Sequence, residues 1–499
     1  MYNHGLHHWI QPNTMLKPTF LPYHAETNTV MSSSDLATKK GKTFTWDEIE
    51  KHNHEGSAWL VIHGKVYDVT KFVPNHPGGD MILLAAGRQS TELFLSHHPT
   101  KTITNQALLD KYYIGEVEQE QVVTEEMIKK QQTKHIYAPD KQTKFYDEVR
   151  SEVEKYFKEN NLTPRDVPEM YVKTILSLSI WFVLYLATFY YFDSIIVSFF
   201  VAIVWGWANA NIGMGMMHDA NHGGYSDNPT INRMVGLCFD VLGGSSYTWK
   251  MIHSVGHHVH TNVEERDPDI HTNEPHFRKI KAGQKHHWWY KYQHIYLPLL
   301  YCTLLFELAF RDFFAMVLGS WGGVKFQPAP KNEYLLFVSS KICWLTYSLA
   351  IPLLFSGHSF QRVLLLWTIA YMVASFILVL NFQVNHVTPI ADTYHVEKDG
   401  MVHADWAETQ VTGSSNFAPR SWLWNHLSGG LCHQTEHHLF PTICHVHYPR
   451  IQPIVERAAK KYGIRYNAYP SFWDAVVGHF TLLKEMGQQG KKVTGWKQL

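Results

Sequence analysis

The sequence predicts a multi-domain protein: a small α+β domain, followed by an all-α membrane domain with four transmembrane helices and a cytosolic histidine-rich cap. Strand-like and helical patterns alternate between about residues 42 and 118. Beyond residue 168, apolar stretches long enough to cross a bilayer occur in two closely spaced pairs. Short histidine clusters lie beside these stretches, in a chain that has 33 histidines. Together these features predict a membrane metalloenzyme.

Composition narrows the class of protein further. The chain has 499 residues, which is enough for more than one domain. Its 44 acidic and 44 basic residues give a formal net charge of zero, which argues against nucleic acid as a partner. The five cysteines form no CxxC pair and all lie from Cys238 onward, so we expect no disulfide framework and a reducing, cytosol-facing environment. Residues 1–41 are polar and interrupted by prolines, which predicts a disordered leader.

The predicted N-terminal domain, residues 42–118, contains two histidine motifs. The segment AWLVIHGKVYDVTKF alternates like paired strands around a turn at His63 and Gly64. The motif NHPGGD then places His76 before a proline and two glycines, which allow a bulky planar ligand to approach the backbone. A helical stretch ends at His97 and His98. Taken alone, such histidines could equally be surface residues in turns.

The order and spacing of the segments decide between these alternatives. WDEI, KVYDVTKF, HPGGD, AAGRQSTELF and HHP follow one another in a pattern that resembles the cytochrome b5 domain. This resemblance implies haem b with two axial histidine ligands, and an electron carrier that does not bind oxygen because no iron position stays open. It implies His76 as the first ligand and His98 as the second, with His97 the less favoured neighbour.

A charged linker, residues 119–168, joins this domain to the membrane domain, residues 169–499. The linker pattern predicts a helix at about 145–160, followed by a break at prolines. The membrane domain has four candidate spans, at about 171–192, 195–217, 335–355 and 363–384. Lys341 lies inside the third and argues against it as a span, unless the span begins a few residues later and the Lys341 stem snorkels to the interface.

A fifth apolar run, residues 295–318, is interrupted by Glu307, Arg311 and Asp312. Two hairpins return the chain to its starting side, which brings all histidine clusters to one side of the membrane. A fifth crossing at this run would separate the second cluster from the third by a bilayer. We therefore expect 295–318 to lie at the interface or to be re-entrant. Basic residues flank the span ends on the cluster side, which predicts that this side is cytosolic.

Three motifs predict a metal centre: HDANH at 218–222, HSVGHH at 253–258 and QTEHH at 434–438. Each places polar side chains one helical turn apart on one face. One such pair alone is usually a solvated helix face. Three clusters beside apolar segments instead predict one transition-metal site assembled from several segments, because imidazole is a good ligand for iron.

The chain as a whole resembles the membrane fatty-acid desaturases, and more narrowly the front-end desaturases, which carry an N-terminal cytochrome b5 domain. The resemblance includes GHHVHTN, DPD at 267–269, FQVNH at 382–386 and HHLFP at 437–441, and a Gln that replaces the first histidine of the third cluster. One departure is the second cluster, which reads HxxxHH where many desaturases have HxxHH. The resemblance implies two irons held by His218, His222, His253, His257, His258, His386, His437 and His438, with Gln434 a ligand or a neighbour of the ligands. Asn381 and Asn385 either position a bound water or are ordinary polar residues at a helix end.

The same resemblance implies the reaction and its setting. We expect an oxygen-dependent oxidoreductase that acts on a fatty acyl lipid or acyl-CoA, with dioxygen, NADH-cytochrome b5 reductase and membrane lipid as partners. The expected location is the endoplasmic reticulum membrane, in a multi-pass topology with the haem domain and histidine clusters facing the cytosol. A front-end enzyme inserts a cis double bond on the carboxyl side of an existing one.

The position of the new bond is less constrained. KTFTWDEI and YKYQHIY are similar to Δ5 desaturases, whereas SWLWNHLSGGL is similar to Δ4 enzymes. We expect Δ5 desaturation of 20-carbon polyunsaturated chains. The alternatives are Δ4 or Δ6 desaturation, Δ8 desaturation of sphingolipid bases, hydroxylation on the same scaffold, and a non-catalytic membrane haem protein that relays electrons.

Overall fold

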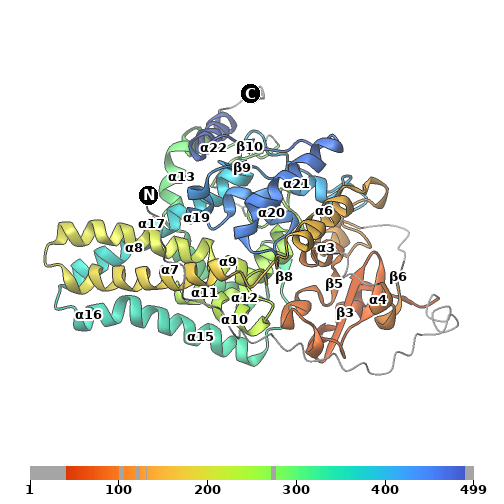
Figure 1. Ribbon diagram of the computed structural model, residues 1–499, viewed down its shortest axis with the longest axis horizontal. Coiled ribbons are helices and arrows are strands. Elements are labelled where there is room, and N and C mark those ends of the chain that lie inside the picture. Colours follow the sequence, from red (N-terminus) through yellow and green to blue (C-terminus); the bar gives the residue numbers. More distant parts are fainter. Residues whose placement is uncertain are drawn as a thin grey trace, which may run out of the picture.

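A computed structural model describes residues 41–100, 106–118, 124–130, 132–270, 277–281 and 283–488. The predicted leader, residues 1–41, therefore lies outside the described residues except for Gly41. Figure 1 shows a small domain with the strands at one end of the molecule, long parallel helices at the other, and a layer of shorter helices above both.

The small domain is α+β, as predicted. Its strands are β1 (Thr43–Phe44), β2 (Asn53–His54), β3 (Ser57–Ile62), β4 (Lys65–Asp68), β5 (Arg88–Gln89) and β6 (Tyr113–Val117). They form a sheet in the order β1-β6-β4-β3-β2, with β5 paired to β3. His63 and Gly64 join β3 to β4 with φ of 49° and 72°, which is what a tight two-residue hairpin requires at both positions. The helical segments are α2 (Trp46–Ile49), η1 (Val73–Asn75), η2 (Gly79–Ala85), α3 (Thr91–His97) and α4 (Gln106–Tyr112).

The linker contains α5 (Glu125–Lys130), η3 (Pro139–Lys141) and the predicted helix, α6 (Phe145–Glu159). Helix α6 is a structural bridge. The Tyr146 hydroxyl donates to the Leu95 carbonyl of the small domain (3.1 Å) and to the Leu439 carbonyl of the upper layer (2.9 Å). Arg150 donates to the His98 carbonyl (2.9 Å). The linker therefore fixes the small domain against the rest of the chain.

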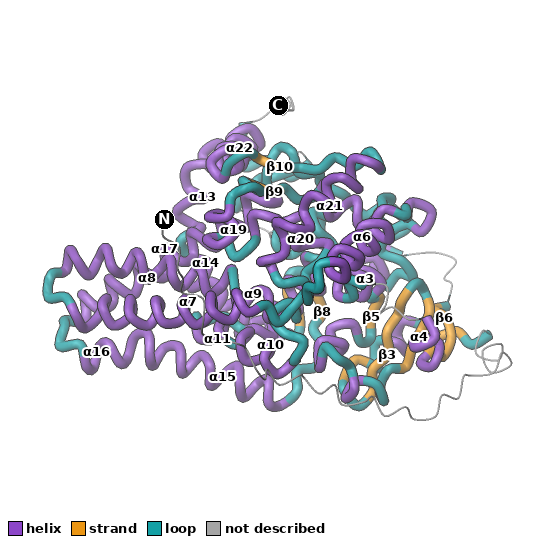
Figure 2. The backbone as a smooth tube through the Cα atoms, viewed as in Figure 1, coloured by secondary structure: helices purple, strands orange, loops and turns teal. Residues whose placement is uncertain are grey.

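Four helical stretches are long and apolar enough to cross a membrane: Pro168–Tyr191, Ile195–Asn221, Lys331–Phe355 and Phe360–His386. They correspond to the four predicted spans and lie side by side in Figure 2. In order, they consist of α7 (Pro168–Leu186) with η4 (Ala187–Tyr191), α8 (Ile195–Met214) with α9 (Met216–Asn221), α15 (Lys331–Leu345) with η7 (Thr346–Ala350) and α16 (Ile351–Phe355), and α17 (Phe360–His386). Helices α8 and α17 approach closely at Gly206, where a Cβ would lie 2.4 Å from the Ala370 carbonyl oxygen.

The fifth apolar run forms α13 (Gln293–Tyr301) and α14 (Leu304–Leu318), which are separated at Cys302 and Thr303. Within the described residues it is not among the candidate spans, in agreement with the topology argument. Helix α14 buries Asp312, whose carboxylate lies 3.4 Å from Lys341 Nζ on α15. Lys341 also donates to the Gly243 and Gly244 carbonyls. The prediction that Lys341 snorkels was wrong: its charge has an internal partner on the neighbouring helix.

The remaining elements form a cap over one end of the four helices (Figure 1). Those before α13 are α10 (Pro229–Gly236), α11 (Cys238–Val241), α12 (Ser246–Trp249), η5 (Lys250–His257) and η6 (Trp288–Tyr292). The hairpin β7 (Ser320–Trp321) and β8 (Val324–Lys325) follows α14. After α17 come α18 (Trp406–Thr412), β9 (Asn416–Phe417), α19 (Trp422–Leu427), η8 (Leu431–His433), α20 (Gln434–Leu439), η9 (His445–His447), α21 (Tyr448–Lys461), β10 (Ala468–Tyr469) and α22 (Phe472–Gly487). Strands β9 and β10 pair in parallel.

Candidate metal centre and adjoining cavity

The predicted metal ligands, distant in sequence, meet at the junction of the four helices and the cap. They come from α9 and its C-terminal end, from η5 and the residue after it, from the last residue of α17, and from α20. Every one of them is buried, and they are His218, His222, His253, His257, His258, His386, Gln434, His437 and His438. One site is thus assembled from four chain segments, as the sequence predicted.

The histidines form two groups whose ligand nitrogens lie within 4.8 Å of one another. The first group comprises His218, His222, His253 and His437, and the second His257, His386 and His438. His258 lies between the groups, with its ring centroid 4.5 Å from that of His222 and 4.4 Å from that of His438. Two adjacent groups of three or four imidazoles fit two metal ions.

Polar partners orient these imidazoles toward one another. The Nδ1 atom of His386 lies 3.3 Å from the Gly413 carbonyl oxygen, and that of His437 lies 3.2 Å from the Tyr448 hydroxyl. The Nε2 atoms of His218, His222 and His437 are buried without a hydrogen-bond partner among the described residues. A buried nitrogen without a partner is costly unless a ligand satisfies it. His437 has both features, an Nδ1 held by the protein and an unpartnered Nε2, and this is the arrangement of a metal-bound histidine.

At most of these positions, the surroundings favour the neutral form of the imidazole. Burial, reinforced by neighbouring imidazoles, lowers the pKa of His222, His258, His437 and His438 well below the usual value. These rings are therefore neutral at physiological pH, and a neutral imidazole is the form that binds a metal.

His257 is different because a buried carboxylate faces it. Its Nδ1 lies 2.9 and 3.0 Å from the two oxygens of Asp267, which is completely buried. Burial alone lowers the pKa of His257, but Asp267 and Asp269 outweigh that effect and raise it to about 9. Asp269 also lies 3.3 Å from Nδ1 of His253. Carboxylates in this position orient a metal-bound histidine and compensate the metal's charge.

The second cluster adopts a π-helix, η5, and not the α-helical turn that the sequence predicted. A π-helix closes its hydrogen bonds between residues i and i+5, as the His258 N–H does with the His253 carbonyl (3.0 Å). The wider turn brings His253, His257 and His258 to one face. The HxxxHH spacing therefore presents its three imidazoles to the same site.

Gln434 lies between two of the histidines. Its Nε2 is 3.0 Å from Nε2 of His386 and 3.1 Å from Nε2 of His438, while its Oε1 accepts a hydrogen bond from Asn385 (3.1 Å). Asn385 thus holds the Gln434 amide. Asn381 instead donates to the Ile377 carbonyl one turn earlier, as an ordinary polar residue of a helix does.

A cavity of about 240 Å³ lies between the two histidine motifs of the small domain and extends to the rest of the chain. The rings of His76 and His98 face each other across it, with centroids 6.3 Å apart. Their Nδ1 atoms lie 3.1 Å from the Gly79 carbonyl oxygen and 2.7 Å from that of Phe94. The Nε2 atoms of the two rings are then left to bind an ion. Because metal–imidazole bonds are about 2 Å long, rings at this separation can share one ion between them.

The cavity walls suit haem. Burial lowers the pKa of His76, and lowers that of His98 to about 3, so both imidazoles are neutral. A Cβ on Gly78 would lie 2.8 Å from Cε1 of His76, so glycine leaves the ring free to keep its position. The lining on this side is mainly apolar, and it includes Leu60, Val69, Phe72, Leu93 and Phe94. His97 also lines the cavity but is not paired with His76 across it: its Nδ1 lies 3.1 Å from the Leu93 carbonyl oxygen, and its Nε2 is buried without a partner among the described residues.

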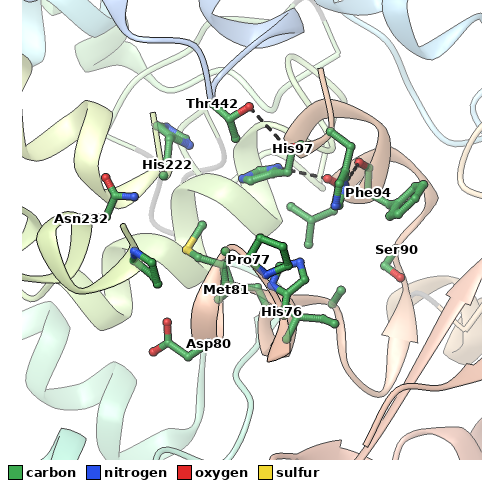
Figure 3. A pocket seen from close by; sticks show the side chains of 18 of the residues that line it. His76, Pro77, Asp80, Met81, Ser90, Phe94, His97, His222, Asn232 and Thr442 are labelled. Carbon is green, nitrogen blue, oxygen red and sulfur yellow. Dashed lines mark hydrogen bonds between the residues drawn. The ribbon is translucent and has the colours of Figure 1, made fainter. Parts of the chain in front are cut away.

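The far wall of this cavity belongs to the metal-centre region. Figure 3 shows His222, Asn232 and Thr442 across the cavity from His76 and Phe94. The rings of His97 and His222 have centroids 6.2 Å apart. The two sites are therefore neighbours, with His97 between them. The sequence contained no signal for this adjacency, because it arises from docking two domains that are separated by a linker.

Comparison with known proteins identifies both regions. The profile described as fatty acid desaturase matches residues 194–470, more than half of the chain. The chain belongs to the fatty acid desaturase family. Residues 45–118 of this desaturase match the profile described as cytochrome b5-like heme/steroid binding domain.

Relatives cover between two thirds and nearly all of the desaturase. It is 38% identical over 478 residues to an acyl-lipid (8-3)-desaturase of Physcomitrium patens, covering 93% of this chain and 98% of the relative. It is 33% identical to Delta(5) fatty acid desaturase A of Dictyostelium discoideum, covering 90% and 94%. An sn-1 linoleoyl-lipid 6-desaturase of Synechocystis is 32% identical over 346 residues, covering 68% and 94%.

These findings confirm the class that the sequence predicted. The protein is an oxidoreductase of the front-end acyl-lipid desaturase family, with a fused cytochrome b5 domain that binds haem and histidine clusters that fit a di-iron site. Its four apolar helices fit a multi-pass membrane protein. Fatty acyl lipid is its class of substrate, and the cytochrome b5 domain is its electron-donating part.

Proposed function

We propose that this desaturase inserts a cis double bond at the Δ5 position of 20-carbon polyunsaturated acyl chains. The observation that best supports an oxidative function is the buried group of nine predicted ligands beside the haem cavity. The Δ5 position is supported by relatives whose names specify Delta(5) and (8-3) desaturation. The overall reaction removes two hydrogens from adjacent carbons and, with two further electrons and two protons, reduces dioxygen to two waters.

In this proposal the two irons are held by the eight histidines, with Gln434 as a ninth ligand or a close neighbour of the ligands. When bound, the irons supply the oxidising chemistry that an unactivated methylene requires and that no protein side chain provides. The chain's own contribution is to hold the site. Asp267 and Asp269 orient His257 and His253, and Asn385 orients Gln434. Burial of all nine side chains limits the access of water, which protects the site from side reactions.

His76 and His98 would hold haem, and when bound this group would supply one-electron transfer to the metal centre. NADH-cytochrome b5 reductase is the proposed donor, and dioxygen the proposed oxidant. We place the protein in the endoplasmic reticulum membrane with both sites facing the cytosol. Basic residues at the cluster-side ends of the spans, such as Lys173 and Lys331, support this orientation.

A second cavity, of about 170 Å³, lies against His386 and is the proposed place for part of the acyl substrate. Ile270, Leu482 and Met486 contribute apolar lining that suits methylene groups. Lys281 also lines it and suits an anionic head group. A cavity beside a ligand is where position along the chain would be selected, because adjacent methylenes are chemically alike.

The test is expression in yeast, which lacks polyunsaturated fatty acids, fed separately with 18-, 20- and 22-carbon polyunsaturated substrates. Gas chromatography–mass spectrometry then reads the double-bond positions. We expect a new Δ5 bond in 20-carbon chains, and no product from His257→Ala although its haem spectrum is unchanged. A bond at Δ4 or Δ6 would overturn the proposed position. Modified long-chain bases without any fatty-acid product would overturn the substrate class in favour of sphingolipids.

A further inference from the structure

The haem cavity has an uneven distribution of charge. Among the described residues that line it, the cytochrome b5 domain contributes one charged side chain other than histidine, Asp80, and no lysine or arginine. The opposite wall contributes three cations, Arg165, Arg233 and Lys250, and one anion, Asp227, which pairs with Arg165. All of the strong positive charge around the cavity therefore comes from outside the haem domain.

Two of these cations are able to bind a further anion. Lys250, the first residue of η5, is only 7% exposed, and among the described residues its Nζ has no hydrogen bond or ion pair. Arg233 uses Nη2 to pair with Glu333, but its Nη1 is buried and has no partner in the part of the chain that the structure describes. Arg165 is occupied, because it contacts Asp227 (3.3 Å) and the Thr442 carbonyl oxygen (3.1 Å). A buried cation without a partner is costly unless an anion joins it.

The ligand of this cavity would bring two such anions. Haem b is apolar over most of its surface but carries two propionate carboxylates at one edge. In Figure 3, His76 and Phe94 lie on one side of the cavity, whereas His222, Asn232 and the haem domain's own Asp80 lie toward the other. Charge complementarity therefore orients the propionate edge toward Arg233 and Lys250.

We propose that haem is bound across the domain interface, with its propionates held by Lys250 and Arg233 of the desaturase region. This inference rests on the proposed haem ligands, His76 and His98. It makes the cofactor a bridge between the two parts of the chain. The haem edge then faces the wall that contains His222, and haem binding stabilises the docked arrangement of the domains.

The experiment compares haem with its dimethyl ester, which keeps the ring and removes both negative charges. Full-length apoprotein is reconstituted with each, and transfer to excess apomyoglobin is followed by absorbance. In the unsubstituted protein we expect the ester to dissociate about tenfold or more faster than haem, the factor expected when charge-assisted hydrogen bonds are lost.

Lys250→Met and Arg233→Gln should speed the loss of haem. The dissociation rates of haem and of its dimethyl ester should therefore become more alike in these variants. Removing a cation also disfavours the more negative, reduced haem, so the midpoint potential should become more negative. The matched control is Lys325→Gln. Lys325 pairs with Glu50 (2.6 Å) between the same two parts of the chain but does not line the cavity, so haem loss should match the unsubstituted protein.

The outcomes separate two failures. Absence of a bis-histidine haem spectrum in the unsubstituted protein would refute the proposed ligands. A normal spectrum with equal retention of haem and ester would refute the propionate contacts alone, and this comparison needs no variant to fold. Haem loss from Lys250→Met no faster than from Lys325→Gln would also overturn the proposal.

Discussion

Replacement of Asp267 by Asn tests whether the buried carboxylate supports metal binding at His257. Asp267 is completely buried, and both of its oxygens contact Nδ1 of His257. They also accept the backbone N–H groups of Asn262 (2.8 Å) and Asp269 (2.9 Å). Asparagine keeps the shape of the side chain but removes the charge. Its NH₂ group also replaces one of the two carboxylate oxygens, so that a hydrogen-bond donor then faces another donor.

The expected magnitude follows from the pKa of His257. The carboxylates raise it from the usual 6.5 to about 9 against the opposing effect of burial. At about 1.36 kcal/mol per pKa unit, they stabilise positive charge on this ring by roughly 3 kcal/mol. A metal ion on the opposite nitrogen makes the same demand. Removing the nearer carboxylate should therefore cost about 10- to 100-fold in metal affinity, the range found for such supporting carboxylates.

The assay measures iron per protein before and during a chelator challenge, with haem absorbance as an internal reference. Asp267→Asn should lose iron much faster than the unsubstituted protein and keep its haem spectrum. Asp269→Asn should have a smaller effect, because its side chain is 35% exposed and lies 3.3 Å from the His253 nitrogen. Asp392→Asn, which removes a surface ion pair with Arg465, is the control. If Asp267→Asn retains iron as long as this control does, the reasoning is refuted.

Four further predictions follow from individual contacts. Burial raises the pKa of Glu92 to about 7, so the folded domain binds this proton more tightly than the unfolded chain and loses stability as pH rises from about 4.5 to 7. Glu92→Gln should therefore raise the melting temperature, followed by haem absorbance, at about pH 8 but not at about pH 4.5; an equal gain at both would contradict this. Gln434→Ala should reduce iron content and turnover with haem unchanged, since the amide contacts His386 and His438; unchanged iron and activity would place it outside the site. His97→Phe should keep the bis-histidine spectrum and slow reoxidation of ferrous haem, whereas loss of that spectrum would make His97 a ligand. Leu482→Trp should fill the cavity at His386 and reduce conversion of 20-carbon chains at normal iron content; full conversion would remove this cavity from the substrate path.

Features that depend on a few neighbouring residues could be predicted from the sequence. The hairpin at His63 and Gly64, the α6 helix and the four apolar stretches follow from local turn chemistry and hydrophobic length. The histidine clusters were recognisable because one helical turn sets which side chains share a face. Residues 295–318 were not expected to span the membrane, because a fifth crossing would keep the histidine clusters on opposite sides of the bilayer.

Features that depend on contacts between distant segments could not be predicted from the sequence. The Lys341–Asp312 pair joins α15 to α14, and no local pattern indicates it. The π-helix at η5 also escaped prediction, because a spacing of four residues is usual in an α-helix. In the structure this spacing has a reason: compared with HxxHH, the HxxxHH cluster has one extra residue, which the wider π turn absorbs while all three imidazoles still face the site.

The fused haem domain is docked by contacts that leave little freedom for a diffusive encounter. Arg150 of the linker helix donates to the carbonyl of His98, and Tyr146 joins Leu95 to Leu439. At another edge of the same domain, Arg88 donates to the Lys325 carbonyl. The contacts to His98 and Leu95 hold the backbone of the segment beside the haem cavity, so they fix the cavity relative to His222. A domain held in this way stays on one side of the metal centre. Fusion therefore fixes the orientation of the electron carrier relative to the metal centre, in addition to raising its local concentration.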